Sequence, residues 1–507
     1  MNQDNGGIIG KINTPTTTVA SGVWTLQDQF EAQTSSIWPL AFPQTTIANS
    51  CRFESGNSDY LDKTFSSASD ENKIFTVSTW VKKSKLGAVD SHQALISAYR
   101  SSDGLQTDVV RFPSNDTFQF YAHTTNSGTN AQLSTNRLFR DLSAWYHIVV
   151  RVDTTQSTAS NRVRIYINGT QETSFSTETY PDQNGTVVWG LGSGVSHQIG
   201  AVGNSHHYSG YLAETIYVDN QSLDATSFGA FNPITNIWEP RGYAGTYGTN
   251  GFRLDFANSS ALGNDVSGND NDFTVNNLTS LDQSTDTCSN NFVAWNPLDG
   301  TDLGDLTFSE GNLKVVNATG VCRGTLAASS GKWYWEIKQI STVNATYPFQ
   351  YGIADTEDSP PTHSSLNNAL IAYSDNNSNK SIKKFANGTE TTVTSTMGSF
   401  DNIAQNDIIQ FAFDADTAKL WVGRNGTYLN SGNPASGTGE VASTNAGNFF
   451  TPCLEHAGAT YTIESNFGSP PYSISSGNTD ANGHGNFEYA VPSGFYAWNT
   501  KNLSEFG

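Results

Sequence analysis

The sequence is poor in charged residues, methionine and cysteine. Charged residues make up 14% of the 507 positions, and there are only 2 Met and 4 Cys. So little charge argues against long solvent-exposed helices, whose outer faces are normally charged. The four cysteines are too widely scattered for a zinc site or a small disulfide framework. We therefore expect buried free thiols at Cys51, Cys288, Cys322 and Cys453.

Long apolar runs and a secretory leader are also missing. No stretch reaches the roughly 18 apolar residues that cross a bilayer. The first seven residues, MNQDNGG, contain neither a basic nor an apolar region. We therefore expect no membrane insertion, and synthesis in a reducing cytoplasm without a signal peptide.

Basic residues are outnumbered by acidic ones. The chain has 26 Lys and Arg against 47 Asp and Glu, a net charge of −21. A field of that sign repels phosphate backbones and anionic lipid surfaces. We expect no nucleic-acid partner, and a charge of this size otherwise serves solubility.

Glycine and aromatic residues, by contrast, are abundant. The chain holds 45 Gly, 11 Trp, 20 Tyr and 28 Phe, with many Ser, Thr and Asn. This composition suits short strands and tight turns around apolar cores. It predicts an all-β chain of short strands, and the motifs and resemblances given below imply two antiparallel β-sandwiches after a short N-terminal segment. The expected divisions are 1–44, 45–230, 231–289 and 290–507.

Three strand motifs occur in order within residues 45–230. FTVSTWV at 75–81 alternates strictly between the two faces of a strand, WYHIVV follows at 145–150, and RIYING at 164–169 ends in an Asn-Gly turn. Further strands are expected at 197–200 and 211–218. In this order the motifs resemble the laminin-G-like or concanavalin-A-like jelly roll, which implies that fold for this segment.

An aromatic strand organises the second half of the chain. In GKWYWEI at 331–337, Trp333 and Trp335 share one face while Tyr334 and Glu336 share the other. A hairpin is expected over 408–422, closed by an Asn-Gly turn. With YGIA at 351–354, FTPC at 450–453 and IESNFG at 463–468, these motifs resemble the SPRY family of β-sandwich recognition modules over about residues 290–500. The resemblance implies a ligand surface made of variable loops and identifies no ligand residue.

The first 44 residues do not resemble part of a sandwich. Thr25 is a candidate N-cap with Asp28 three residues later, which predicts a helix of about two turns over 25–32. A helix this short is marginal alone, so its apolar residues need a surface to pack against. They either dock on the chain's own first sandwich or anchor it to another protein. The candidate anchor contacts are Ile9, Trp24, Leu26, Phe30 and Trp38.

A resemblance favours the anchor. ASGVWTL at 20–26, followed by an acidic helix and Trp38-Pro39, is similar to the leaders of structural proteins of marine bacteriophages. The resemblance implies attachment of residues 1–44 to other virion proteins.

The connector at 231–289 is rich in oxygen donors. Asp265, Asp270 and Asp272 lie close together, as a hard cation such as calcium requires. The twelve-residue loop with a terminal bidentate Glu is absent, and Asp and Asn are ordinary turn residues. We expect a structural role and no cofactor, with calcium as the alternative.

Catalytic motifs are not evident. Glycosidases need two carboxyl groups across a cleft, but Glu336 and Glu214 each lack a partner nearby in the sequence, so we expect both at a surface or edge. His147 is expected to point outward, and no regular His spacing predicts a metal site. We expect no enzymatic activity, no catalytic residues and no metal.

Recognition is the remaining role. Loops rich in Asn, Ser, Gly, Tyr and Trp can hydrogen-bond sugar hydroxyls and stack on their apolar faces. The candidate loops are 196–209 and 360–379, with His206, His207, Tyr208, His363 and Tyr373 as candidate ligand contacts. Plain solvated connections are the alternative for each loop.

These observations lead to one hypothesis with two alternatives. We expect a bacteriophage virion protein, a tail or capsid fibre whose sandwiches bind a host-surface glycan or protein. A homotrimer is one arrangement open to such a fibre. The alternatives are a polysaccharide-degrading enzyme on the first sandwich and a cellular SPRY-type adaptor.

Overall fold

The computed structural model describes residues 24–34, 45–66, 73–87, 91–100, 106–123, 130–186, 195–233, 235–303, 306–317, 320–343, 348–357, 366–375, 379–456 and 461–507. Ile9, Trp38 and His363 lie outside these residues. The chain divides into two compact units. One holds the described residues within 1–46 and 226–244, and the other holds those within 47–225 and 245–507.

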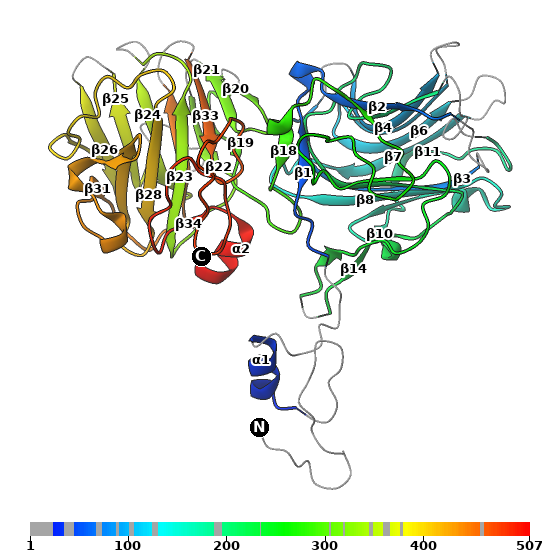
Figure 1. Cartoon of the computed structure of the whole chain (residues 1–507), viewed down its shortest axis with the longest axis horizontal. Coiled ribbons are helices and arrows are strands. Elements are labelled where there is room, and N and C mark those ends of the chain that lie inside the picture. Colours follow the sequence, from blue (N-terminus) through cyan, green and yellow to red (C-terminus); the bar gives the residue numbers. More distant parts are fainter. Residues whose placement is uncertain are drawn as a thin grey trace, which may run out of the picture. The chain divides into compact units, whose positions relative to one another are not determined.

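Two antiparallel eight-stranded sheets form the first sandwich (Figure 1). One sheet runs in the order β10-β9-β8-β3-β13-β1-β18, with β16 also paired to β13, and the other runs β11-β7-β6-β5-β4-β12-β2-β17. The strands of the first sheet are β1 Ser50–Phe53, β3 Ile74–Lys83, β8 Tyr146–Asp153, β9 Val163–Ile167, β10 Thr170–Gln171, β13 Gly210–Asp219, β16 Phe252–Leu254 and β18 Gln283–Ser284. Those of the second are β2 Tyr60–Thr64, β4 His92–Arg100, β5 Gln106–Pro113, β6 Thr117–His123, β7 Asn130–Leu138, β11 Phe175–Thr179, β12 Val195–Ile199 and β17 Thr274–Asn276.

Alternation along the strands fills the space between these two sheets. Phe75, Val77 and Val81 of β3 enter the same core as Ile148 and Val150 of β8, as the period of two predicts for a half-buried strand. Burial of such side chains, at about 25 cal/mol per Å² of apolar surface, is the main stabilising contribution.

Two further sheets form the second sandwich (Figure 1). The first has seven strands in the order β19-β22-β32-β24-β25-β26-β27, and the second has nine, built on β20-β21-β33-β23-β28-β29-β30 with β31 and β34 added at its sides. The first contains β19 Trp295–Thr301, β22 Gly320–Gly324, β24 Phe349–Asp355, β25 Ala369–Ser374, β26 Lys380–Ala386, β27 Thr389–Val393 and β32 Phe450–His456. The second contains β20 Leu306–Ser309, β21 Lys314–Asn317, β23 Lys332–Gln339, β28 Ile408–Asp414, β29 Lys419–Arg424, β30 Thr427–Tyr428, β31 Ala442–Ser443, β33 Tyr461–Asn466 and β34 Tyr496–Ala497.

The aromatic strand β23 lies at the centre of this sandwich. Trp333 and Trp335 face the main core, where Trp335 stacks on Phe411 of β28 with ring centroids 5.0 Å apart. Tyr334 faces the other way into a smaller cluster with Phe487 and Phe495. The all-β prediction of two antiparallel sandwiches is therefore confirmed, and so is the alternation predicted for this strand.

The segment predicted as a connector, 231–289, is largely part of the first sandwich. Strand β16 pairs with β13, β17 with β2, and β18 with β1, so this segment adds strands to both sheets. The prediction missed β17 and β18 because these strands are only three and two residues long and lie among turn residues. The connector boundary is thus corrected.

The other unit contains helix α1, Leu26–Thr34, and a hairpin of β14, Gly229–Phe231, and β15, Trp238–Pro240. The Thr25 hydroxyl accepts a hydrogen bond from the Asp28 backbone N–H at 3.1 Å, which confirms the predicted N-cap. The segment that follows this hairpin contacts the segment that precedes β1, because the Gly242 N–H donates to Thr45 Oγ1 at 2.7 Å.

Helix α2, Thr500–Phe506, ends the chain and was not predicted. Asn499 caps it by accepting a hydrogen bond from the Asn502 backbone N–H at 3.0 Å. No helix among the described residues is long and apolar enough to span a bilayer.

Candidate functional site

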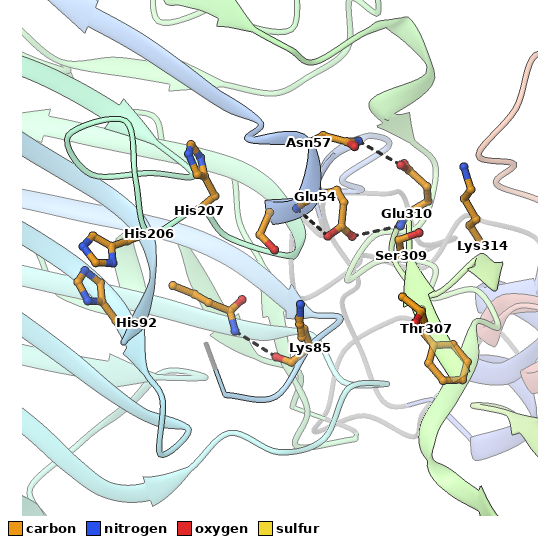
Figure 2. Close-up of a pocket in the computed structure, with 14 residues that line it drawn as sticks. Glu54, Asn57, Lys85, His92, His206, His207, Thr307, Ser309, Glu310 and Lys314 are labelled. Atoms are coloured by element: carbon orange, nitrogen blue, oxygen red, sulfur yellow. Dashed lines mark hydrogen bonds between the residues drawn. The ribbon is translucent and has the colours of Figure 1, made fainter. Parts of the chain in front are cut away.

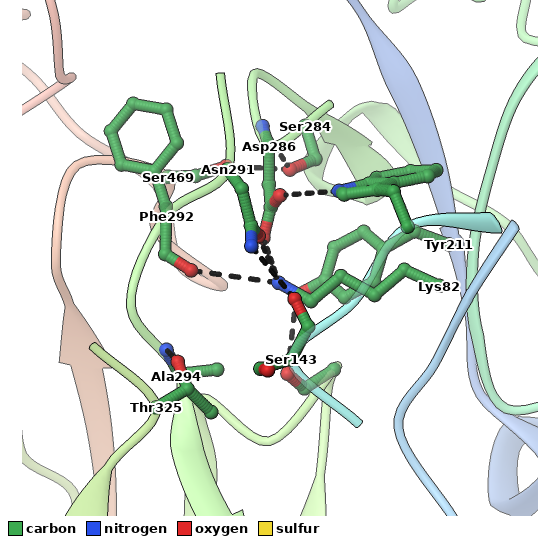
Figure 3. A network of polar contacts seen from close by, with 12 residues as sticks. Lys82, Ser143, Tyr211, Ser284, Asp286, Asn291, Phe292, Ala294, Thr325 and Ser469 are labelled. Carbon is green, nitrogen blue, oxygen red and sulfur yellow. Dashed lines mark hydrogen bonds and ion pairs between the residues drawn. The ribbon is translucent and has the colours of Figure 1, made fainter. Parts of the chain in front are cut away.

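A buried lysine joins the two sandwiches. The Lys82 ammonium, at the end of β3, lies 2.8 Å from Asp286 Oδ2 and 2.6 Å from Asn291 Oδ1 (Figure 3). Asp286 also accepts a hydrogen bond from Trp145 Nε1 at 3.0 Å. Lys82 and Asp286 are both buried. Because a buried charge is tolerated only when it is paired and hydrogen-bonded, these contacts fix the start of the second sandwich against the first.

A buried arginine makes a second connection. Arg52 on β1 donates to the Leu281 carbonyl at 2.7 Å, and its Nε lies 3.5 Å from Glu310 Oε2 in the turn between β20 and β21. Tyr211 of β13 donates to the Gly311 carbonyl in the same turn at 3.2 Å. We call the contact region formed by these residues and the Lys82 network the seam.

A pocket of about 430 Å³ opens at the seam (Figure 2). Both sandwiches supply its walls, and polar or charged side chains predominate. It is lined by Glu54, Ser55, Gly56, Asn57, Lys85, His92, Gln93, His206, His207, Thr307, Phe308, Ser309, Glu310 and Lys314. A volume in the range of roughly 300–1,000 Å³ is typical of small-ligand sites. We call this cavity the first seam pocket.

Glu54 forms the centre of the wall contributed by the first sandwich. It is the N-cap of a short 3-10 helix, Ser55–Asn57, and its Oε1 accepts from the Gly56 N–H at 3.2 Å. Its Oε2 accepts from the Glu310 N–H at 3.2 Å, across the seam. Burial raises the pKa of the Glu54 carboxyl, while these hydrogen bonds oppose the rise.

Two histidines stack along one side of the pocket. The rings of His92 and His206 lie 3.9 Å apart at 17° (Figure 2). Arg111 on β5 lies 3.3 Å from His92 Nε2. Burial, followed by the nearby Arg111 charge, lowers the pKa of His92 to about 3, so this ring stays neutral at physiological pH. His207 lies on the same loop, with its ring centroid 5.7 Å from that of Tyr60.

The hairpin of β20 and β21 supplies the opposite wall. Asn57 Nδ2 donates to Glu310 Oε1 at 3.2 Å, which links the two walls directly (Figure 2). Lys314 lies 3.5 Å from Glu464, and its side chain lines the pocket. The pocket thus offers carboxylates, ammonium groups, hydroxyls and imidazoles at close range, a set that can bind a hydroxyl-rich ligand bearing charged groups.

A third carboxyl group lies behind the pocket. Asp59 is buried, and its Oδ2 accepts from the Glu54 N–H at 2.8 Å. Burial, together with the charges of Asp282, Glu310 and Glu54, raises the pKa of Asp59 to about 7, although the hydrogen bond from the Glu54 N–H opposes the rise. The Arg52 guanidinium lies near two of these carboxyl groups, 3.5 Å from Glu310 and 3.9 Å from Asp282.

The candidate ligand contacts lie in three different parts of the structure. His206 and His207 line the first seam pocket. Tyr208 is buried in the core, where its hydroxyl donates to the Lys82 carbonyl at 2.7 Å, so it cannot meet a surface ligand. Tyr373 lies on β25, far along the chain from this pocket's residues, with the Lys383 ammonium 5.1 Å from its ring.

The acidic turns at 265–272 have an internal structural role. Asp265 accepts hydrogen bonds from the backbone N–H groups of Arg253, Ser267 and Asn271 at 2.8 to 2.9 Å. Asp272 in turn accepts from the Asp265 N–H at 2.8 Å. Asp270 is exposed and has a positive φ of 55°. Within the described residues, no group of three or more His, Cys, Asp and Glu could hold a metal ion.

Three residues expected at the surface are buried. Glu336 accepts from the backbone N–H groups of Glu488 and Tyr489 at 3.0 and 2.8 Å, because the C-terminal segment covers that face of β23. Glu214 is paired with Arg253 of β16 at 2.6 Å. His147 stacks on Trp80 with centroids 4.7 Å apart. The sequence prediction was wrong for all three because their partners are distant in the chain.

Sequence reasoning also missed the acidic residues of the pocket. Glu54 and Glu310 are 256 positions apart, and neither belongs to a recognisable motif. Only His206 and His207, within a polar loop after an expected strand, gave a usable signal.

A comparison with protein-family models supports the fold predicted for the first sandwich. Residues 55–218 match the family model of the concanavalin A-like lectin/glucanases superfamily, which supports the laminin-G-like prediction for that segment. No curated protein matched the chain. The superfamily match ends one residue before the end of β13, so it does not include the strands β16, β17 and β18.

Three solved structures are among those with detectable similarity to the chain. The SPRY domain of human HERC1 is 11% identical, covering 34% of this chain and 96% of that domain, with a TM-score of 0.25. Domains LG4-5 of the mouse laminin α1 chain are 8% identical, covering 89% and 99%, with a TM-score of 0.26. A heptameric pentraxin from Limulus polyphemus is 17% identical, covering 35% and 79%, with a TM-score of 0.25. Scores of this size carry no argument about function.

Proposed function

We propose that this chain is a non-enzymatic recognition protein whose first seam pocket binds a glycan or protein on a cell surface. The supporting observation is a pocket walled by two sandwiches that are joined by the Arg52–Glu310 ion pair and by the hydrogen bond from the buried Lys82 to Asn291. A site held by rigid elements loses little conformational freedom when a ligand binds, so weak polar contacts are used efficiently.

The proposal extends to the setting of the protein. We propose a bacteriophage virion protein, a tail or capsid fibre located on the particle, with residues 1–44 contacting other virion proteins. The unit that contains α1 and the β14–β15 hairpin supports this proposal because it exposes large apolar side chains. Phe30 of α1 is 61% exposed, and Phe231 and Ile237 of the hairpin are 43% and 60% exposed. Trp24 is half-buried. In this proposal the exposed side chains pack against a virion partner, which removes their apolar surface from water.

Many copies on one particle would make weak binding effective. A tethered site meets its ligand at a high local concentration, so avidity can exceed single-site affinity by roughly 10²–10⁴-fold. A homotrimer is compatible with such a fibre, and a particle carrying many copies satisfies the same requirement.

The test deletes residues 1–44 in the particle and compares it with the full-length chain carrying Thr307→Trp. Thr307 is exposed and lines the first seam pocket, so the tryptophan should fill the pocket without altering a core. The deleted chain should be lost from purified particles by quantitative mass spectrometry, while retaining both sandwiches by circular dichroism. Particles carrying Thr307→Trp should contain normal amounts of the chain but attach poorly to cells.

Each arm can fail separately. Normal incorporation of the deleted chain would exclude residues 1–44 as the anchor, whereas absence of the full-length chain from purified particles would favour a cellular adaptor. Normal attachment by the Thr307→Trp particles would exclude the first seam pocket as the recognition site.

A second candidate function is polysaccharide hydrolysis, because two carboxyl groups line this pocket. Burial raises the pKa of Glu54, as in a general acid, and Glu310 lies opposite it. Against this, Glu54 already accepts hydrogen bonds from Gly56, Glu310 and Ser209, which hold it as a structural acceptor. Incubation with capsular and algal polysaccharides separates the two: release of reducing ends that Glu54→Gln abolishes would establish the enzyme.

A further inference from the structure

A second pocket lies at the seam, and its lining differs from that of the first. Its volume is also about 430 Å³. Its walls come from the strands and turns that complete the first sandwich and from the segment after β33 of the second. It is lined by Ser259, Ser280, Leu281, Gln283, Ser284, Thr285, Ser469, Pro470, Tyr472, Ser473, Ile474 and Asn486. We call it the second seam pocket.

The second seam pocket is polar without being charged. Among the described residues that line it there is no Asp, Glu, Lys, Arg or His, whereas hydroxyl and amide side chains are numerous. Hydroxyls and amides both donate and accept hydrogen bonds. An ionic ligand would lose its hydration there without gaining a counter-charge, which is costly. The lining therefore favours a neutral ligand that carries many hydroxyl groups.

Tyr472 contributes aromatic surface to the pocket wall. It is 4% exposed, and its hydroxyl is buried near the Asn466 side chain, away from the pocket. Asn466 in turn donates to Glu336 and to the Asn486 carbonyl. An aromatic ring beside hydroxyl and amide groups suits the apolar face of a sugar.

The floor of the pocket is also built across the seam. Ser284 of β18 and Ser469 are both buried, and their hydroxyl oxygens lie 2.7 Å apart. Leu281, Pro470 and Ile474 add apolar surface beside these hydroxyls. Apolar patches next to hydrogen-bonding groups match a sugar ring, which has C–H faces and hydroxyl edges.

We propose that the second seam pocket binds a neutral saccharide. The inference rests on the recognition role proposed above and deepens it, since it gives this chain a second contact with a glycan, separate from the charged first pocket. A pocket of this volume holds a short segment of an oligosaccharide within the usual range of ligand sites, roughly 300–1,000 Å³.

The test uses the full-length chain and isothermal titration calorimetry. The probes are three neutral hexasaccharides, maltohexaose, cellohexaose and laminarihexaose, together with the acidic hexagalacturonate. At least one neutral probe should bind, and hexagalacturonate should bind that pocket at least tenfold more weakly. Bound sugar should protect the backbone amides of 280–285 and 469–474 from hydrogen exchange.

Three variants locate the site. Ser473→Trp places a bulky ring at an exposed position of the second seam pocket and should weaken binding at least tenfold. Thr307→Trp makes the matching change in the first seam pocket and should leave neutral-sugar binding unchanged. Tyr472→Phe removes only the buried hydroxyl and keeps the ring, so it should leave neutral-sugar binding unchanged.

The outcomes distinguish this inference from the proposed function. Absence of binding by all three neutral probes would overturn it, as would equal binding of hexagalacturonate. Loss of neutral-sugar binding in Thr307→Trp with retention in Ser473→Trp would place the sugar in the first pocket, so that the proposed function stands and this inference fails. Failure of the 1–44 deletion test would affect only the anchor.

Discussion

Lys82 offers the sharpest test of how the two sandwiches are held together. Its ammonium is buried, with Asp286 at 2.8 Å and the Asn291 oxygen at 2.6 Å, and Asp286 is itself buried. Methionine keeps the stem of the side chain but removes the charge. Lys82→Met therefore leaves the Asp286 carboxylate buried without its counter-charge, a change that costs roughly 3–5 kcal/mol.

The assay is urea denaturation followed by tryptophan fluorescence, with hydrogen exchange of residues 284–292 as a local readout. Lys419→Met is the matched control, because Lys419 pairs with Glu440 at 3.1 Å while both side chains are 32% exposed. A pair exposed to that extent contributes about 0–1 kcal/mol. Lys82→Met should also raise exchange in 284–292, whereas the control should not.

A double variant isolates the pair itself. Asp286→Asn neutralises the carboxylate but keeps an oxygen that can accept from Trp145. The double variant Lys82→Met with Asp286→Asn should lose less than the sum of the two single losses, by about 1–3 kcal/mol. Equal losses for Lys82→Met and Lys419→Met would refute the claim that this ion pair fixes the seam.

Three other predictions concern buried groups. Because the pKa of Asp59 is raised from 3.8 to about 7 in the fold, its contribution to stability is present below about pH 4 and is lost as pH rises through 7. The loss is about 2 kcal/mol after allowance for partial solvent screening, and Asp59→Asn should remove that pH dependence from melting curves recorded between pH 4 and 8. Gly311→Ala places a Cβ 2.0 Å from the Tyr211 hydroxyl, at a φ of +65°. Gly437→Ala is the control, because Gly437 has a similar φ of +72° but open space around it, so Gly311→Ala should lower the melting temperature more. Equal effects of the two substitutions would contradict the clash. Glu336→Leu should cost about 2–4 kcal/mol in urea denaturation, because two partly buried backbone N–H groups lose their acceptor. A loss below about 0.5 kcal/mol would show that water replaces the carboxylate.

The sequence predicted long, regular elements well and short ones poorly. Strands such as β3 and β23 were recognised because their alternation extends over seven or more residues. Strands β17 and β18 have three and two residues, which is too short for a period of two to be detected. Their pairing depends on edges supplied by β2 and β1, which are distant in the chain.

The candidate site shows the same division. His206 and His207 were predicted as ligand contacts from a local feature, a polar loop, and they line the first seam pocket. Glu54 and Glu310 become neighbours only because β1 and the β20–β21 turn meet at the seam. Glu336 was misjudged for the same reason, since its burial depends on residues more than 150 positions later.

The route of the chain through the first sandwich has a mechanical consequence. The unit with α1 and the β14–β15 hairpin is joined to the rest by three covalent crossings, at 46–47, 225–226 and 244–245. These crossings lead to β1, β13 and β16, and β13 is hydrogen-bonded to both of the others. A force applied to that unit is therefore distributed over three strands that are hydrogen-bonded within one sheet. None of the three can separate from the sheet unless the force also acts on a neighbouring strand.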